Sequence, residues 1–333
     1  MNQRIETALE VAPARAGSSA RDRSGSARPG RAVVGVLVGT ACVDLIWCLS
    51  TGFEVTGLVP AAAVLALLCA IGIYYTVIRS APPLAEFALY LAAWLAFIAT
   101  GGIFSYLAAT SPRPFSDDLF VAADSVLRFD WARWVATVQQ YPALTGVLEF
   151  SYNSLLMQIL GSVCLFSFTK AQNRNAELLL ASSIAALLCS VVFAFFPAVG
   201  PWIHFDAPDN NPLKMLYVNH LIALKEGALR VVALKEIEGI ICFPSYHTSL
   251  ACVFVYAHRG LYWTRWPVLV LNALMLLSIP SQGGHYLSDV VAGIGAALLA
   301  IGAARALSGG EAAARAGPRR WSPERPRRRD AVP

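Results

Sequence analysis

The sequence predicts an all-α protein, a polytopic membrane bundle of about eight transmembrane helices, and three observations predict it. Hydrophobic residues make up 56% of the 333-residue chain and charged residues 14%, whereas soluble domains are about 45–50% apolar and about 25% charged. Eight apolar segments approach the roughly 20 residues that a helix needs to cross a bilayer. The basic residues gather in the two tails, so the net charge of +5 does not indicate a nucleic-acid partner.

The eight apolar segments follow one another with short and long connections. The predicted spans are 32–51, 58–78, 86–109, 143–168, 176–197, 244–261, 265–280 and 284–307. The tails 1–31 and 309–333 are rich in Arg, Pro, Gly and Ser and poor in large apolar residues, so we expect both to be disordered. The seven cysteines show no paired spacing and lie mostly in apolar runs, which predicts no disulfide framework.

Lys and Arg in the short loops predict the orientation. Positive residues favour the cytoplasmic side of a membrane, and with the N-terminus inside, the short cytoplasmic loops hold Arg79, Lys170, Arg174, Arg259 and Arg265. The short outer loops, TGFEVTG and PSQGG, contain neither Lys nor Arg. We therefore expect a multi-pass protein of the inner or plasma membrane with both termini in the cytoplasm.

Two outer loops are long. The first, 112–142, shows apolar residues at helical spacing together with Trp131 and Trp134, which is typical of an amphipathic helix at the membrane interface. The second, about 198–243, contains another amphipathic stretch and leads directly into a histidine motif. Loops of this length are usually lids or binding loops when they are ordered.

The histidine motifs are FPSYHT at 243–248 and GGHYLSD at 283–289. By the predicted topology, His247 lies at the outer end of the sixth span, and His285 and Asp289 lie at the outer end of the eighth. The last two are four residues apart, on one face of a helix. Ionisable groups inside spanning segments are costly and point to function, and two such sites at matched depth strengthen this interpretation.

These groups suit phosphoryl transfer. A neutral imidazole can attack phosphorus while a carboxylate on its other nitrogen holds the tautomer, and a second imidazole can protonate the leaving oxygen. A zinc site is the competing interpretation, but an Asp four residues after a His is equally a second-sphere partner. A transporter with a proton relay through Asp44, Glu149 and the histidines is a third, although transporters usually contain repeated halves and no repeat is visible here.

The two motifs together resemble the second and third motifs of the type 2 phosphatidic acid phosphatase superfamily, closest to its branch of inositol phosphorylceramide and sphingomyelin synthases. The matching positions are Pro244, Ser245, His247, Ser278, His285 and Asp289. The resemblance implies that His285 is the nucleophile, Asp289 its partner and His247 the general acid, with a phosphohistidine intermediate, no metal and no cofactor. It also implies a six-helix catalytic domain over 81–308, with two additional helices over 32–80.

Further contacts to substrate are expected from residues beside these motifs and on the fourth span. The candidates are Ser245, Tyr246, Gly284, Tyr152 and Asn153. For Tyr152 and Asn153, which with Glu149 can share one helix face, hydrogen bonding between helices is an equal alternative.

The sequence also departs from the family pattern. Ile279 stands where the third motif has Arg, and the segment FFPAVGPWIHF contains neither the Lys nor the Arg of the first motif. Lys170 and Arg174 lie on the other membrane face by the predicted topology. A phosphomonoester carries close to two charges near neutral pH and a lipid phosphodiester carries one, so the diester needs less neutralisation.

The sequence therefore predicts a phosphotransferase that moves a phosphate-containing headgroup between lipids at the extracytoplasmic face. Its expected substrate is a membrane phospholipid or sphingolipid. Hydrolysis of a lipid phosphomonoester is the alternative, because the outer loop offers cations that could bind a dianion. These are Lys214, Lys225, Arg230 and Lys235.

Overall fold

The computed structural model describes residues 30–169, 171, 173–206 and 212–316. Within these residues the chain is almost entirely helical, with two strands of three residues each, which confirms the predicted all-α class. Almost all of the predicted N-terminal tail and residues 317–333 of the C-terminal tail lie outside the described residues. The last helix runs to Ala316, beyond the predicted end of the span at 307, and the alanines at 312–314 favour helix.

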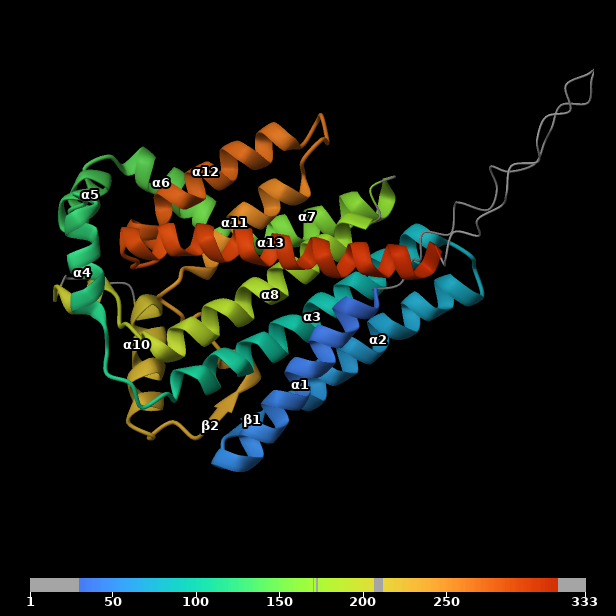
Figure 1. Cartoon of the computed structure of the whole chain (residues 1–333), viewed down its shortest axis with the longest axis horizontal. Helices are drawn as coiled ribbons and strands as arrows, with labels where there is room; N and C mark the ends of the chain where they lie inside the picture. The colour runs from blue at the N-terminus through green and yellow to red at the C-terminus, as the bar shows by residue number, and fades with distance from the viewer. Residues whose placement is uncertain (1–29, 170, 172, 207–211, 317–333) are drawn as a thin grey trace, which may run out of the picture.

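Figure 1 labels the elements in chain order. They are α1 Arg31–Thr51, β1 Glu54–Thr56, α2 Leu58–Val77, α3 Pro82–Ala109, α4 Asp117–Val126, α5 Trp131–Gln139, α6 Pro142–Asn153, α7 Leu155–Phe168, α8 Asn173–Phe195, α9 Pro201–His204, α10 Pro212–Lys225, β2 Val231–Ala233, the 3-10 helix η1 Leu234–Glu236, α11 Tyr246–Ala257, α12 Arg265–Gln282 and α13 Leu287–Ala316.

Five helices among the described residues are long and apolar enough to cross a membrane, namely α1, α2, α3, α8 and α13. A sixth span arises if α6 and α7, which meet at an angle of 52°, are counted together. The predicted span 244–261 is shortened to the 12 residues of α11, about 18 Å at 1.5 Å per residue. It ends at Ala257, shortly before Gly260, whose φ of 72° lies in the left-handed region, and the capping residue His258 is buried and hydrogen-bonds Ser162 at 3.0 Å and Thr264 at 2.9 Å.

The bundle is organised around α8. This helix packs against α3, α11 and α13, and in its apolar part, after Glu177, the buried hydroxyl residues are the small serines Ser182, Ser183 and Ser190, which allow close approach. The two additional helices lie outside this core, with α2 against α3 and α1 against both α3 and α8 (Figure 1). The loop between α1 and α2 is tied to the outer loop, since β1 pairs with β2 in parallel, Glu54 opposite Val231.

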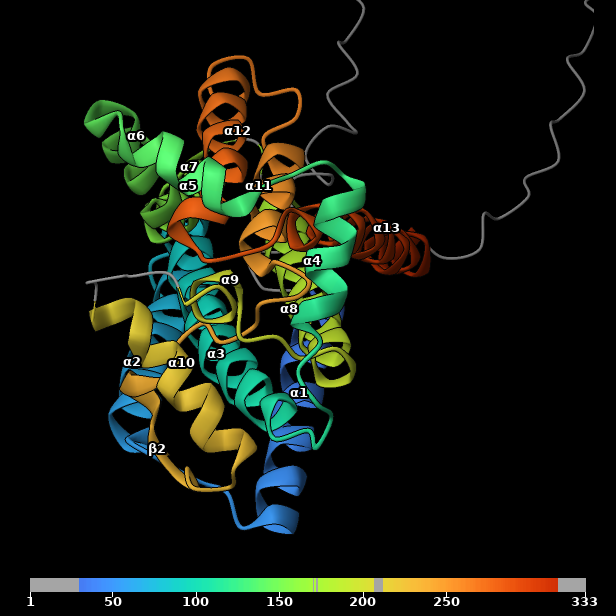
Figure 2. The same ribbon diagram turned by 90° about the vertical axis from the view of Figure 1, so that its left-hand side faces the viewer.

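The short helices α4, α5 and α10 gather at one end of the bundle, as Figures 1 and 2 show. The first outer loop forms two helices instead of one, because Arg128 adopts a left-handed conformation with φ of 55° and Asp130 caps α5 by accepting from the Arg133 N–H. Trp131, expected at the headgroup level, is buried and donates to the Pro280 carbonyl at 2.8 Å. It anchors α5 to the end of α12.

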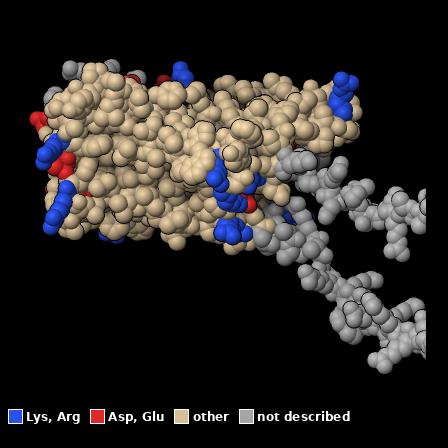
Figure 3. All heavy atoms as spheres, turned by 90° about the horizontal axis from the view of Figure 1, so that it is seen from above, with Lys and Arg blue, Asp and Glu red and all other residues tan. Residues whose placement is uncertain are grey.

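The outer surface of the bundle is apolar. Large hydrophobic side chains of the candidate spans are exposed on α1, α2 and α13, among them Leu49, Val59 and Leu299. Figure 3 shows one face on which Lys, Arg, Asp and Glu are sparse and most of the surface is uncharged. Such a surface is stable in hydrocarbon and not in water, so the protein is an integral membrane protein.

Candidate active site

The site begins with the turn that leads into α13. Gly284 has φ of +62°, and a methyl group there would lie 2.2 Å from Trp202 Cδ1. Only glycine satisfies both the left-handed backbone and the contact with the indole. The turn reverses the chain after α12, so that His285 lies in the turn two residues before α13 rather than on the helix face that the sequence predicted, and Asp289 lies in the first turn of α13.

His285 and Asp289 form a buried pair. His285 Nδ1 lies 3.0 Å from Asp289 Oδ2, and the two residues are 5% and 0% exposed. Because a carboxylate accepts, Nδ1 carries the hydrogen and the Nε2 lone pair is left free. Asp289 Oδ2 also accepts from the Tyr286 N–H at 3.0 Å and from the Cys242 thiol at 3.1 Å, while Oδ1 is buried without a hydrogen-bond partner.

The second motif is joined to the first through the backbone. Ser245 is the N-cap of α11 and accepts from the Thr248 N–H, and its own N–H donates to the Asp289 carbonyl at 3.1 Å. A methyl group at Gly293 would lie 2.5 Å from the Ser245 carbonyl oxygen, so α13 passes directly against the start of α11. Two helix N-termini, with their positive dipole ends, therefore meet beside His285.

His247 reaches the same place from α11. Its ring stacks on Tyr152 of α6, with centroids 4.4 Å apart and planes inclined by 10°. Gly283 lies between this stack and His285. Its lack of a side chain lets them approach, since a methyl group there would lie 2.8 Å from His285 Cδ2 and 2.9 Å from Tyr152 Cε2. The structure thus brings together the two histidines, the aspartate and Tyr152, from three parts of the chain.

The other candidates for substrate contact are placed differently. Tyr246 donates to the Ser182 carbonyl on α8, and Ser245 is fully buried as a helix cap. Asn153 is exposed and donates to the Glu149 carbonyl of its own helix. Gly284 packs against Trp202. These four contacts are structural within the described residues, and a role in substrate binding stays a prediction for each.

The structure adds Cys242, which sequence reasoning treated as a small hydrophobe. Burial and the Asp289 carboxylate raise the pKa of the Cys242 thiol well above its ordinary value, so the thiol stays protonated and can donate to Asp289 Oδ2. Its place two residues before Pro244 was visible in the sequence, but a contact across 47 positions was not.

Two buried aspartates of α4 were also missed. Asp117 accepts from the N–H groups of Val199 and Gly200 at 3.1 and 2.9 Å and from the Tyr286 hydroxyl at 2.9 Å. Asp124 accepts from the N–H groups of Leu287 and Ser288, at 2.9 and 2.8 Å, at the start of α13. The sequence did contain a sign of this role, because Asp117, Phe120 and Asp124 lie on one face of a helix. We had assigned this helix to the membrane interface instead.

The model of the PAP2 superfamily matches residues 118–303, more than half of the chain. The chain belongs to the PAP2 superfamily. No curated protein and no solved structure matches it significantly. Members of this superfamily are phosphatases and phosphotransferases, so the protein is an enzyme of that type that acts on lipids. The match begins in α4, one residue after Asp117, and includes Tyr152, Cys242, His247, His285 and Asp289.

Two of the four cations of the outer loop, Lys225 and Arg230, donate to backbone carbonyls outside this PAP2 site. Lys225 donates to the carbonyls of Ser111 and Arg113, and Arg230 donates to those of Gly227 and Thr51. Lys235 is exposed on η1, and the side chain of Lys214 lies outside the described residues. Ile279, at the Arg position of the third motif, is fully buried.

A metal interpretation has a structural counterpart, although with a different set of residues. Ligand atoms of Cys242, His285 and Asp289 lie within 4.8 Å of one another, and all three residues are buried. The sequence had suggested His247 in place of Cys242. In the structure the thiol and the imidazole both satisfy Asp289 Oδ2 as hydrogen-bond donors. Independence from metal therefore stays a prediction.

Proposed function

We propose that this PAP2 enzyme transfers a phosphate-containing headgroup from one membrane lipid to the hydroxyl group of another through a phosphohistidine. The observation that carries the proposal is the buried His285–Asp289 pair, whose Nδ1–Oδ2 hydrogen bond leaves Nε2 free beside the stacked His247. The same geometry supports a metal-independent mechanism with a histidine nucleophile.

In the first step, His285 Nε2 attacks phosphorus, an N–P bond forms and the bond from phosphorus to the donor lipid oxygen breaks. His247 gives its proton to that oxygen, which leaves as an alcohol. Asp289 stabilises the positive charge that develops on the His285 ring and holds the ring in place. The N–H groups at the start of α11 suit the phosphoryl oxygens.

In the second step, the hydroxyl oxygen of the acceptor lipid attacks the phosphohistidine. His247, now neutral, removes the hydroxyl proton, the N–P bond breaks, and both histidines return to their starting state. Water in place of the acceptor would release the phosphorylated headgroup from a diester donor, or inorganic phosphate from a monoester, and in the second case the enzyme would be a phosphatase. The choice between transfer and hydrolysis therefore depends on which hydroxyl group reaches phosphorus.

Charge supports a phosphodiester as the substrate. Among the described residues, the groups that hydrogen-bond His285 and Asp289 include neither Lys nor Arg. Asp117 and Asp124 are buried beside the site, and the backbone N–H groups they occupy are not free to bind an anion. Repulsion from these carboxylates grows with substrate charge, so a dianionic monoester is disfavoured more than a monoanionic diester.

The test is incubation of purified full-length protein with lipids of several headgroups, labelled in the phosphate, with and without lipid alcohols as acceptors. We expect label to move to the acceptor lipid, and acid-labile, base-stable label on the protein after a rapid quench. Release of inorganic phosphate from a monoester, with no transfer to any acceptor, would instead establish the phosphatase. Protein label that persists in His285→Ala would place the nucleophile elsewhere.

A further inference from the structure

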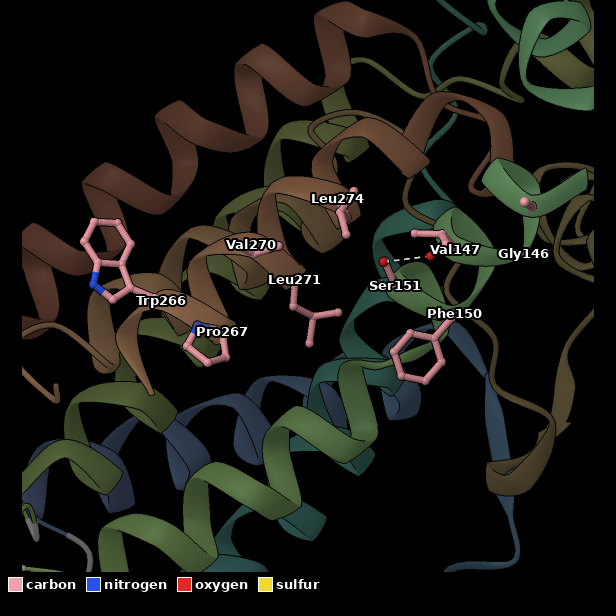
Figure 4. A pocket seen from close by; sticks show the side chains of 10 residues that line it. Gly146, Val147, Phe150, Ser151, Trp266, Pro267, Val270, Leu271 and Leu274 are labelled. Atoms are coloured by element: carbon pink, nitrogen blue, oxygen red, sulfur yellow. Dashed lines mark hydrogen bonds between the residues drawn. The ribbon is translucent and has the colours of Figure 1, made fainter. Parts of the chain in front are cut away.

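A groove runs along the outside of the bundle between α6 and α12. Its volume is about 720 Å³, and its walls are two stripes at helical spacing (Figure 4). The residues that define it are Gly146, Phe150 and Ser151 on α6 and Val270, Leu271 and Leu274 on α12. Except for the Ser151 hydroxyl, which donates to the Val147 carbonyl, these side chains are apolar.

The groove is open on its outer side. Phe150 and Val270 are each 58% exposed although both are large and apolar. A Cβ atom added at Gly146 would meet nothing within 4 Å, so this glycine leaves space that a larger residue could fill. Beyond Asn153 the chain bends by 52° into α7. Together α6 and α7 are long and apolar enough to count as one bent membrane span, which under the predicted topology places the groove against hydrocarbon.

The groove and the histidine site share one turn of α6. Ser151 lines the groove, and Tyr152, the next residue, stacks on His247. Successive side chains on a helix are about 100° apart, so the two sites occupy adjoining sides of the same turn. From Leu274 the groove continues along α12 to Trp266 (Figure 4), eight residues or about 12 Å away.

We propose that this groove binds the hydrocarbon tail of the lipid whose phosphate lies at His247 and His285. The proposal rests on the proposed function and adds the place of the tail. A tail suits the groove because its lining is apolar, it is open to the bilayer and it adjoins the stacked Tyr152. The direction also agrees: under the predicted topology α12 begins at the cytoplasmic side, so a tail running toward Trp266 descends into the membrane.

The principal variant is Gly146→Leu, which fills the groove without a clash. Its matched control is Gly39→Leu on α1, another exposed glycine with nothing within 4 Å of an added Cβ. A second pair is Val270→Trp with Val64→Trp on α2, since both valines are exposed in the bundle. Both glycine variants gain helix propensity equally, so a difference in kcat/KM between them is due to the side chain that fills the groove.

Each variant is assayed with a long-chain lipid phosphodiester and with a short-chain, soluble analogue of the same headgroup. We expect Gly146→Leu and Val270→Trp to lower kcat/KM for the long-chain lipid at least about tenfold, the effect of losing about two buried methylene groups. The value for the soluble analogue should remain within about twofold, as should both values for the two controls. Equal losses on both substrates, or none, would overturn the proposal.

A direct readout does not depend on turnover. The same long-chain lipid with a photoactivatable diazirine in its tail is added to the His285→Ala variant in bilayer discs, and labelled peptides are mapped. We expect label on 142–153 and 265–282. Label spread evenly over α1, α2 and α13, or crosslinks from α6 and α12 to a second protein chain, would exclude the tail as occupant.

The two readouts separate the groove from the function. If label appears in the groove but the unmodified protein turns over no phosphate ester, the groove still binds the tail and the proposed function is refuted. If the protein turns over the lipid, Gly146→Leu keeps the same preference for long chains and no label appears on α6 or α12, the proposed function stands. The proposal that the groove binds the tail is then refuted.

Discussion

Replacing Asp289 with Asn removes one charge while preserving the shape of the side chain. In the structure, Asp289 Oδ2 accepts three hydrogen bonds, from His285 Nδ1, the Tyr286 N–H and the Cys242 thiol, and Oδ1 has no partner. An amide group that faced these donors with its nitrogen would lose all three contacts. The amide oxygen must therefore replace Oδ2, and the amide nitrogen must occupy the dry position of Oδ1.

The expected magnitudes follow from this placement. A buried amide nitrogen without an acceptor costs about 1–3 kcal/mol of folding stability. The catalytic loss is larger, because the positive charge that develops on His285 no longer faces a carboxylate 3.0 Å away. The comparable Asp→Asn change in a serine protease triad lowers kcat about 10⁴-fold. We expect kcat for Asp289→Asn to fall roughly 10²–10⁴-fold with little change in KM.

The assay measures kcat, KM, the amount of phosphorylated protein after a rapid quench and the melting temperature in detergent. The matched control is Glu86→Gln, which makes the same carboxyl-to-amide change at another buried position, where Glu86 Oε1 accepts from Asn175 at 2.9 Å on α8. We expect the control to change stability and leave kcat within about threefold. A folded Asp289→Asn protein with unchanged kcat, or an equal loss in Glu86→Gln, would refute the assigned role.

Three further predictions concern the remaining parts of the site. His247→Ala should lose about 10²–10⁴-fold on a natural lipid, whose alkoxide needs a proton, but far less on a nitrophenyl phosphodiester; equal losses on the two would remove His247 as the acid. Activity should survive thorough chelation, whereas loss on chelation and recovery with zinc would assign the cluster of Cys242, His285 and Asp289 to a metal. Gly283→Ala should fold normally but lower kcat at least about tenfold. Its methyl group would lie 2.8 Å from His285 Cδ2, and a small displacement of a reacting group is costly. Unaltered turnover would show that the His285 and Tyr152 rings move apart freely.

The length and polarity of the segments determined much of the fold. Long uninterrupted apolar runs predicted α1, α2, α3 and α8 within about four residues, and α13 except for its C-terminal end, because in hydrocarbon the backbone has few alternatives to a helix. The same reasoning failed at the bend between α6 and α7, where no proline marks the break. It also failed at α11, which has 12 residues where the apolar run 244–261 predicted a full span.

For the site, the sequence by itself determined what lies within one turn of helix. The Pro-Ser start before His247 is local, and its cap follows from the rules for helix starts. The spacing of His285 and Asp289 is local too and predicted that the two side chains lie close, although His285 lies in the turn before α13 and not on a helix face. Only the tertiary structure decided that Tyr152 stacks on His247, that Cys242 donates to Asp289 and that Asp117 and Asp124 bind the backbone beside them. These contacts join residues from 47 to 163 positions apart, and they exist because helix packing, rather than any local pattern, sets which buried polar groups become partners.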